Sequence, residues 1–268
     1  MMISNSSTTS NITYKGHGIT SKQAVAVEVE QREAGYGIVF ALKQDGQITE
    51  LPAHHANVVN TLRNVVLGKD KARLCIVEHF LAAAAVWGLE DLYVTVDGPE
   101  MPLGDGSANF WIELFKQGGW QQRPIVPNVE LTQPVSCSLG DRTLLAVPAE
   151  SFSATYMMDW NHPMIGKRWY TWTAQTPVED IALARTFGSQ KEHDMLGLSN
   201  EVVSMTPDDF SKPLRWPDEP VRHKVLDLIG DLYLAGCNPL RWKAHFISMK
   251  GGHQLDVKLA GLLAEQRK

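Results

Sequence analysis

The sequence has few cysteines, no long apolar run and no secretion signal. Its three cysteines, Cys75, Cys137 and Cys237, are widely separated, so they can form neither a disulfide framework nor a cysteine-based zinc finger. The longest strongly apolar stretch, 80–89, is about half of the ~20 residues that a membrane-spanning helix needs. The first eleven residues lack the basic start and apolar core of a signal peptide. We expect no membrane span and a reducing, cytoplasmic location.

Positive charge and several familiar catalytic motifs are also scarce. Lys and Arg number 25 against 30 Asp and Glu, a net charge of −5, and no basic run is long enough to bind nucleic acid. The sequence has no Gly-x-Ser-x-Gly elbow, Walker A loop, Gly-x-Gly-x-x-Gly turn or His-Glu-x-x-His helix. Serine hydrolases, nucleotidases and dehydrogenases therefore lose their best support. The remaining composition, 44% hydrophobic and 21% charged, is typical of a globular protein.

Apolar periodicity predicts an α+β fold with two similar halves. In the first half we expect strands at 24–31, 37–44 and 92–96, a buried helix at 76–87, and a helix at 109–117 capped from 105–107. In the second half we expect strands at 129–135, 143–148, 152–160, 168–173 and 242–249, and helices opening at Thr176-Pro177-Val178-Glu179, at 220–235 and at 255–265. Pro124 and Pro127 flank a linker, which predicts domains at 11–124 and 128–268.

One predicted helix carries an unusual polar stripe. His223, Asp227 and Asp231 stand four residues apart, so they share one face of a helix that is otherwise rich in Val, Leu and Ile. That face must meet either water or a group that compensates buried charge. A divalent metal would compensate it, whereas a surface His/Asp pair with Asp231 in a solvated ion pair is the alternative.

A second predicted helix offers a matching imidazole. His79 lies in the first turn of the buried Ala-rich helix, where the helix dipole disfavours a protonated ring and leaves a lone pair for metal. A catalytic zinc takes three protein ligands and keeps one position for water. Glu78 is then a candidate base and His253 a candidate proton donor, although a Glu-His pair at a helix start can also serve as a cap. The other histidines noted, His54, His55, His193 and His245, are interpreted as structural or surface residues.

Four motifs in order connect these residues to a known family. They are Val77-Glu78-His79-Phe80-Leu81-Ala82-Ala83; Asp97-Gly98-Pro99-Glu100-Met101-Pro102 with Asp105-Gly106-Ser107-Ala108; Ala184-Arg185-Thr186-Phe187-Gly188; and Arg222-His223-Lys224-Val225-Leu226-Asp227 through Asp231. From about Gly16 to its C-terminus the sequence resembles UDP-3-O-acyl-N-acetylglucosamine deacetylases. These zinc amidases commit precursors to lipid A. Asn161-His162-Pro163 also matches a family segment, without an assigned role.

The resemblance implies a fold, a cofactor and a set of residue roles. Two domains of like topology would each carry a small sheet and helices, with the helices packed between the sheets as a β-α-α-β sandwich and zinc at the seam. The implied roles are zinc ligands His79, His223 and Asp227; general base Glu78; general acid His253 oriented by Asp231; oxyanion helpers Lys224 and Thr186; and a sugar contact at Phe187, with Lys224 also binding substrate. Fe2+ is an alternative metal. The implied enzyme is a monomer that hydrolyses an acylated UDP-sugar and binds no nucleic acid.

Two segments depart from the family pattern. The family's Gly-Leu-His-(Ser/Thr)-Gly reads Gly18-Ile19-Thr20-Ser21-Lys22 here, so one family histidine is absent. The stretch 189–221 is shorter than its family counterpart, which walls the acyl passage, so we expect a shallower dependence of kcat/KM on acyl length. The alternative is an equivalent wall rebuilt from Met195, Leu196, Leu198, Val202, Val203 and Met205.

Two other functions stay open at this point. The chain could act as a metal-dependent amidohydrolase on another acylated sugar, or it could bind a sugar nucleotide without catalysis. The complete set of candidate catalytic residues, from Glu78 to His253, argues against the non-catalytic alternative.

Overall fold

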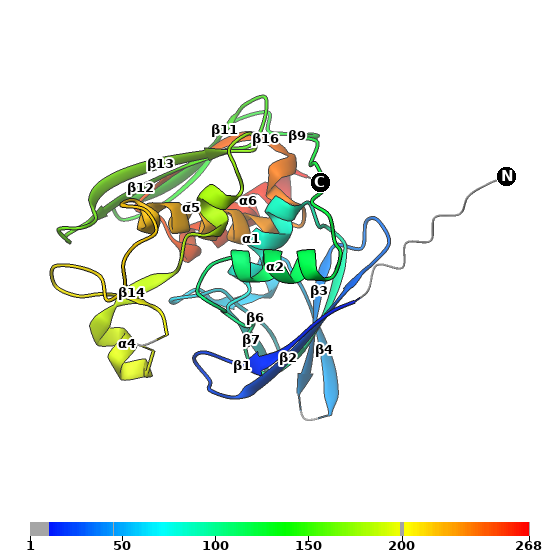
Figure 1. Cartoon of the computed structure of the whole chain (residues 1–268). Helices are drawn as coiled ribbons and strands as arrows, with labels where there is room; N and C mark the ends of the chain where they lie inside the picture. Colours follow the sequence, from blue (N-terminus) through cyan, green and yellow to red (C-terminus); the bar gives the residue numbers. More distant parts are fainter. Residues whose placement is uncertain (1–10, 45, 199–200, 268) are drawn as a thin grey trace.

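The computed structural model describes residues 11–44, 46–198 and 201–267. Two sheets form the outer layers and the main helices lie between them (Figure 1). This arrangement confirms the predicted α+β fold of two sandwiched units. The N-terminal unit lies at the bottom of Figure 1 and the C-terminal unit at the top.

The two sheets have the same strand order and directions. The first runs β1 (Ile12–His17), β2 (Ala24–Gln31), β8 (Leu92–Asp97), β3 (Ile38–Gln44) and β4 (Gln47–Pro52). The second runs β10 (Val135–Leu139), β11 (Arg142–Pro148), β16 (Trp242–Met249), β12 (Ser153–Trp160) and β13 (Gly166–Thr173), with β9 (Val129–Glu130) beside β16. The central strand of each sheet, β8 or β16, is the last strand of its half. It pairs in parallel with β3 in the first sheet and with β12 in the second.

The shared topology agrees with the predicted similarity of the two halves. The strands of the first sheet fall within 12–97 and those of the second within 129–249, which is compatible with the expected linker. The domain bounds 11–124 and 128–268 stay a prediction.

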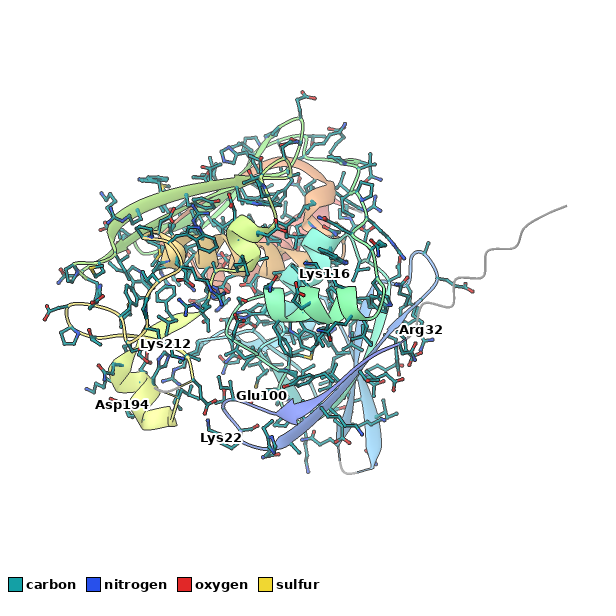
Figure 2. The ribbon with its side chains drawn as sticks, viewed as in Figure 1. Lys22, Arg32, Glu100, Lys116, Asp194 and Lys212 are labelled. Carbon is teal, nitrogen blue, oxygen red and sulfur yellow. The ribbon has the colours of Figure 1, made fainter. Side chains whose placement is uncertain are left out.

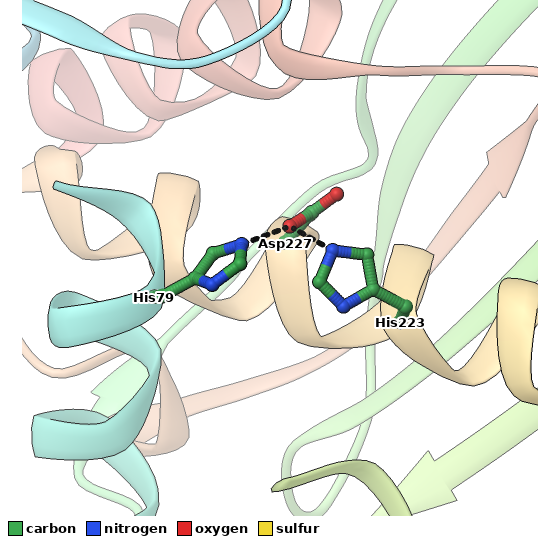
Figure 3. A group of neighbouring side chains, drawn as sticks. All are labelled: His79, His223 and Asp227. Carbon is green, nitrogen blue, oxygen red and sulfur yellow. Dashed lines mark ion pairs between the residues drawn. The ribbon is translucent and has the colours of Figure 1, made fainter. Parts of the chain in front are cut away.

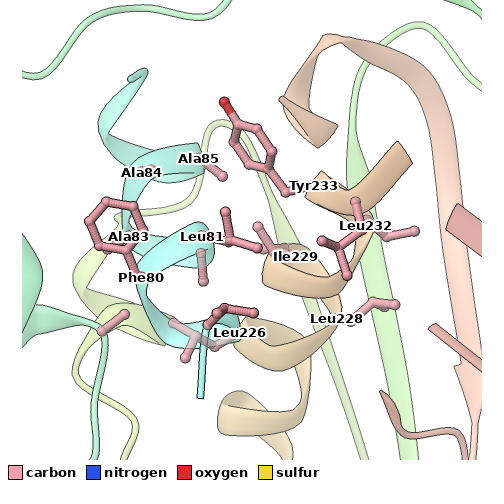
Figure 4. Close-up of a cluster of buried hydrophobic side chains, with 14 of the residues drawn as sticks. Phe80, Leu81, Ala83, Ala84, Ala85, Leu226, Leu228, Ile229, Leu232 and Tyr233 are labelled. Atoms are coloured by element: carbon pink, nitrogen blue, oxygen red, sulfur yellow. The ribbon is translucent and has the colours of Figure 1, made fainter. Parts of the chain in front are cut away.

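Four helices fill the middle layer, and smaller helices join them to the sheets. The four are α1 (Glu78–Trp87), α2 (Asn109–Gln117), α5 (Glu219–Leu232) and α6 (His253–Gln266); the smaller ones are α3 (Glu179–Ala182) and short 3-10 turns at 55–57, 233–235 and 239–241. Every residue of α1 is buried, as its uniformly apolar sequence predicts. Side chains of α1 and α5, such as Leu81 and Ile229, pack against each other across the seam (Figure 4).

The contact between α1 and α5 depends on a glycine. A Cβ atom added to Gly230 would lie 2.1 Å from the carbonyl oxygen of Glu78, which is backbone and cannot rotate away. The missing side chain therefore lets the first turn of α1 lie directly on α5.

Several expected element boundaries differ from those of the structure. The helix expected at 76–87 begins at Glu78 because Ile76 has a φ of +62°, in the left-handed region that a β-branched residue adopts only at a cost. The strand expected at 129–135 is only the two-residue β9, and pairing resumes at 135 after Pro134, which cannot donate to a ladder. The helix expected at 255–265 begins earlier, at His253.

Both expected side-chain caps are also wrong. The oxygen Oδ1 of Asp105 accepts hydrogen bonds from the backbone N and the hydroxyl of Ser107, and the cap position of α2 is Ala108 without a side-chain bond. The Thr176 hydroxyl accepts from the backbone N of Thr173, so it closes a turn before α3. In both cases a local turn competes successfully with the helix for the same oxygen.

Several short elements were not predicted. They are β1, β4, the sheet of β5 (Val58–Asn60), β6 (Val66–Lys69) and β7 (Ala72–Cys75), and the unit of β14 (Phe187–Ser189), α4 (Gln190–Leu196) and β15 (Val203–Met205). Most are too short to show a hydrophobic period.

Charged side chains cover the outside of the molecule, including Arg32, Lys116 and Lys212 (Figure 2). No helix among the described residues is long and apolar enough to cross a membrane.

The close approach at Gly230 gives the first prediction. Gly230→Ala should lower the free energy of unfolding by about 1–3 kcal/mol, because α1 and α5 must separate to admit the methyl group. Chemical denaturation of both proteins measures the difference.

Gly261→Ala in α6 is the matched control. Its added Cβ would meet only a ring atom of His55, at 3.1 Å, so we expect an unfolding free energy within about 1 kcal/mol of wild type. Equal stability of the Gly230 and Gly261 variants would show that the helices do not need this glycine.

Candidate metal centre and active site

Two imidazoles and a carboxylate meet at the seam between α1 and α5. The oxygen Oδ1 of Asp227 lies 3.2 Å from Nε2 of His223 and 3.6 Å from Nε2 of His79 (Figure 3). One potential ligand atom from each residue lies within 4.8 Å of the others, and all three residues are buried. The structure thus brings together the three residues that the sequence analysis singled out as ligands.

Both histidine rings direct Nε2 toward this point. His223 Nδ1 lies 3.0 Å from the carbonyl oxygen of Ala184. A carbonyl only accepts hydrogen bonds, so Nδ1 carries a proton and Nε2 is the nitrogen available to a metal. Burial, followed by the neighbouring His223, lowers the pKa of His79 to about 3, so the His79 ring is neutral at pH 7.

Asp227 supplies the negative charge of the group. Burial alone would raise its pKa, but His223 and then Lys224 hold the pKa well below the usual range. Lys224 Nζ donates to Oδ2 at 2.7 Å, whereas Oδ1 is buried and has no hydrogen-bond partner among the described residues. An unpartnered carboxylate oxygen beside two imidazole Nε2 atoms is a donor set that fits a divalent cation.

Glu78 lies at the first position of α1, beside His79. Its Oε2 accepts a hydrogen bond from the backbone N of Val65 at 3.1 Å. We expected the helix dipole to favour the ionised form, but burial is the larger effect and raises the pKa of Glu78 to about 8. The carboxyl group therefore exchanges its proton close to neutral pH, which suits a general base.

His253 approaches from the other end of the site. Its Nδ1 lies 2.7 Å from Oδ2 of Asp231, which is completely buried rather than solvated. The preceding loop turns sharply, with φ of +55° at Lys250 and +139° at Gly252, and this turn makes His253 the first residue of α6. The Asp231 carboxylate orients the ring and leaves Nε2 to act on a substrate.

The remaining predicted residues surround the same site. The backbone N of Thr186 donates to the carbonyl oxygen of Gly106 at 2.7 Å, which ties the segment before β14 to the N-terminal unit. Phe187 packs edge-on against His223, with ring centroids 6.2 Å apart. Lys224 Nζ lies 5.9 Å from the centre of the Phe187 ring.

A cavity of about 460 Å³ contains these groups and extends along an apolar wall. Glu78, His79, Thr186, Lys224 and His253 all line it. The buried residues Ile19, Ile76, Leu103, Leu198 and Val202 form the apolar cluster at its other end. Of the six residues considered for a rebuilt wall, Leu196, Leu198, Val202 and Met205 line the cavity, whereas Met195 is 79% exposed and Val203 belongs to the main core. Four of the six residues thus line the cavity, and the expected change in acyl-length dependence stays a prediction.

Two residues on the cavity surface were missed in the sequence analysis, and a third, His193, was interpreted there as structural or surface. Trp160 at the end of β12 lines the cavity and packs against Phe187, with centroids 5.4 Å apart. Asn64 lines the cavity and has a buried side-chain oxygen without a hydrogen-bond partner among the described residues. His193 lines the cavity and bonds Ser204 through Nδ1 at 2.8 Å. For Trp160 the available signal was its position directly before Asn161-His162-Pro163, whereas Asn64 had none.

A larger cavity of about 670 Å³ lies near the C-terminal ends of the two central helices. It is lined by residues such as Tyr233, Asn238 and Arg241. Neither of the two candidate metal-binding groups found among the described residues lies there, so its size alone does not make it the reactive site.

The arrangement of residues at the seam is typical of one enzyme class. Two histidines and a carboxylate, with a separate carboxyl group and an imidazole nearby, are the parts of a metal-dependent hydrolase. Comparison with known proteins then specifies the family. The family model for UDP-3-O-acyl N-acetylglycosamine deacetylase (LpxC) matches residues 6–265, and the chain belongs to this metal-dependent family.

Relatives named UDP-3-O-acyl-N-acetylglucosamine deacetylase match over nearly their whole length. The protein from Thermosynechococcus vestitus is 35% identical, with 95% of this chain and 92% of the relative covered. That from Synechocystis sp. is 35% identical, covering 95% and 96%, and that from Leptospira biflexa is 33% identical, covering 96% and 88%. The resemblance inferred from the four motifs is confirmed.

The ligand geometry predicts how metal content responds to substitution. His79→Ala, His223→Ala and Asp227→Ala should each reduce the bound divalent metal from about one ion per chain and lower its affinity at least 10- to 100-fold. Elemental analysis and competition with a chelator measure both quantities.

His245→Ala is the control, since His245 is bonded to Thr155 on the second sheet, away from the three ligands. It should keep the wild-type metal content. Full occupancy in all three ligand variants would eliminate the proposed centre.

Proposed function

We propose that the chain hydrolyses the N-acetyl group of UDP-3-O-acyl-N-acetylglucosamine and releases acetate, the committed step of lipid A biosynthesis. The observation that carries this proposal is the convergence of His79, His223 and Asp227 beside Glu78 and His253 in one cavity with an apolar end. Family membership supports the same reaction.

Under this proposal, His79, His223 and Asp227 hold a zinc ion, with Fe2+ as the alternative. Such an ion, when bound, polarises the amide carbonyl and lowers the pKa of a water molecule. Lys224 fixes the second oxygen of Asp227, which keeps the first oxygen directed at the two imidazoles.

Glu78 acts as the general base. It removes a proton from the attacking water as the water oxygen bonds to the acetamide carbon. Burial raises the pKa of Glu78 to about 8, and a divalent cation beside it favours the ionised form that accepts this proton.

Thr186 and Lys224 act on the charge that develops on the carbonyl oxygen. Both line the cavity close to the ligand group, where a hydroxyl or ammonium donor stabilises an oxyanion more strongly than it would in water. The ammonium group of Lys224 donates one hydrogen bond to Asp227. Its other two protons can therefore reach the substrate. Phe187 and Trp160 supply aromatic surface for the sugar.

His253 acts as the general acid. Its protonated ring donates a proton to the sugar nitrogen while the carbon–nitrogen bond breaks, which gives a free amine and acetate. Asp231 holds Nδ1, so the ring presents Nε2 to the leaving group.

The apolar end of the cavity receives the acyl chain. Each methylene buried there contributes about 0.8 kcal/mol, so Leu198 and Val202 select for chain length. We further propose that the enzyme works in the cytoplasm. We also propose that it works as a monomer, because a single chain supplies all the proposed catalytic groups, with Thr186 before β14 and the others on α1, α5 and α6.

The acid–base roles give a kinetic prediction. Glu78→Gln and His253→Ala should keep the metal but lower kcat by about 10²–10⁴-fold. The wild-type pH profile of kcat/KM should fall on its acidic side as Glu78 becomes protonated, and Glu78→Gln should flatten this acidic limb.

Glu113→Gln on the surface of α2 is the control and should leave the profile unchanged. Acetate release from the UDP-sugar provides the measurement. A wild-type rate in either active-site variant would remove that residue from the mechanism.

The apolar wall gives a second kinetic prediction. Leu198→Ala should lower kcat/KM by about 5- to 30-fold for a long acyl chain, because several methylene contacts are lost, and have little effect for a short one. Met195→Ala is the control, since Met195 is exposed outside the cavity. An equal loss for all chain lengths would contradict the assignment of this wall.

A further inference from the structure

A second carboxyl group is buried behind His253. Asp256 lies one turn after His253 on α6 and is 0% exposed. Potential ligand atoms of Asp231, His253 and Asp256 lie within 4.8 Å of one another. Neither oxygen of Asp256 has a hydrogen-bond partner among the described residues, and Oδ1 of Asp231 also has none.

Two ionised carboxylates in this position would be costly. Each would lose its hydration, and the two negative charges would repel each other at short range. The titratable groups that interact with Asp256 are Asp231, Asp227 and Lys224 on α5, His253 on α6, Tyr156 on β12 and Cys137 on β10. Lys224 is the permanent cation among them, and its ammonium group is bonded to Asp227.

A single proton on this pair of carboxyl groups removes one of the two negative charges, which lowers the cost of lost hydration and ends the repulsion. A protonated Asp256 has an O–H donor, and the unpartnered Oδ1 of Asp231 is the acceptor nearby. The same arrangement leaves Oδ2 of Asp231 for His253. The two oxygens of Asp231 are then held from opposite sides, and the carboxylate cannot rotate away from the imidazole.

We propose that Asp256 is a neutral carboxylic acid at pH 7 that donates a hydrogen bond to Oδ1 of Asp231 and so positions His253. Asp256 contacts His253 through Asp231, so it is a positioning residue rather than a catalytic one. Burial, followed by the charge of Asp231, raises the pKa of Asp256 to about 8. Burial, followed by the charge of Asp227, raises the pKa of Asp231 well above its usual range, in agreement with one proton bound by this pair. The effect on catalysis rests on the proposed function, whereas the location of the proton does not.

Stability tests whether folding binds a proton that depends on the Asp256 carboxyl group. A carboxyl group whose folded pKa is raised gives stability that is present at low pH and lost as the pH rises through the folded value. Asp256→Asn keeps a donor to Asp231 and cannot titrate. In the metal-loaded full chain, the folding equilibrium constant of Asp256→Asn relative to wild type should therefore rise by up to about tenfold per pH unit between pH 5 and 8. Parallel stability curves would show that Asp256 is ionised in the folded protein and overturn the proposal.

The positioning role is tested by rescue. Asp256→Ala should lower kcat about 10- to 100-fold with KM and primary metal content unchanged, and Asp256→Asn should retain kcat within a few-fold of wild type. A kcat for Asp256→Asn as low as that for Asp256→Ala would show that the donated hydrogen bond does not position His253. A second bound zinc ion that is lost in Asp256→Ala would make Asp256 a ligand and also overturn the proposal.

The stability experiment and the rescue experiment distinguish a failure of this proposal from a failure of the proposed function. If the wild-type chain released no acetate from the UDP-sugar, the proposed function would fail, but the pH dependence of stability would still show whether the Asp231–Asp256 pair binds a proton on folding. Asp141→Asn is the matched control for both arms, because Asp141 is an exposed carboxylate paired with Lys250. It should change neither the slope of stability with pH between 5 and 8 nor kcat.

Discussion

The contact between α1 and α5 is the constraint on which the site depends. Gly230 lets the first turn of α1 lie on α5 at backbone distance, and that turn carries Glu78 and His79. On the facing helix, Asp227 then lies within 3.6 Å of the His79 ring. The surrounding apolar layer, in which all of α1 is buried, excludes the water that would otherwise solvate these charges. The packing of the core and the placement of the reactive groups are therefore one arrangement.

Burial determines the electrostatics of every group at this seam. It opposes charge on His79, Glu78 and Asp256 and raises or lowers their pKa values accordingly. Asp227 stays ionised because two partners outweigh the same effect. The site thus separates groups that hold a charge from groups that exchange a proton near neutral pH, which acid–base chemistry requires.

Long, regular patterns were predicted well from the sequence, whereas tertiary effects were not. The stripe of His223, Asp227 and Asp231 was visible because helical spacing is local. The left-handed Ile76, the protonation of Glu78 and the backbone approach at Gly230 all depend on segments that are distant in the sequence, so no local pattern encodes them. Asp256 had a local signal, its position three residues after His253, but its meaning depends on Asp231 from another helix.

The repeated strand order of the two sheets has a consequence for cooperativity. Each half supplies one central helix to the seam, and the candidate ligand group is divided between them, with His79 from the first half and His223 with Asp227 from the second. A cation held by all three links two topologically equivalent units, so its binding free energy also counts toward their association. A metal ion bound there would therefore make metal occupancy and the association of the two halves depend on each other.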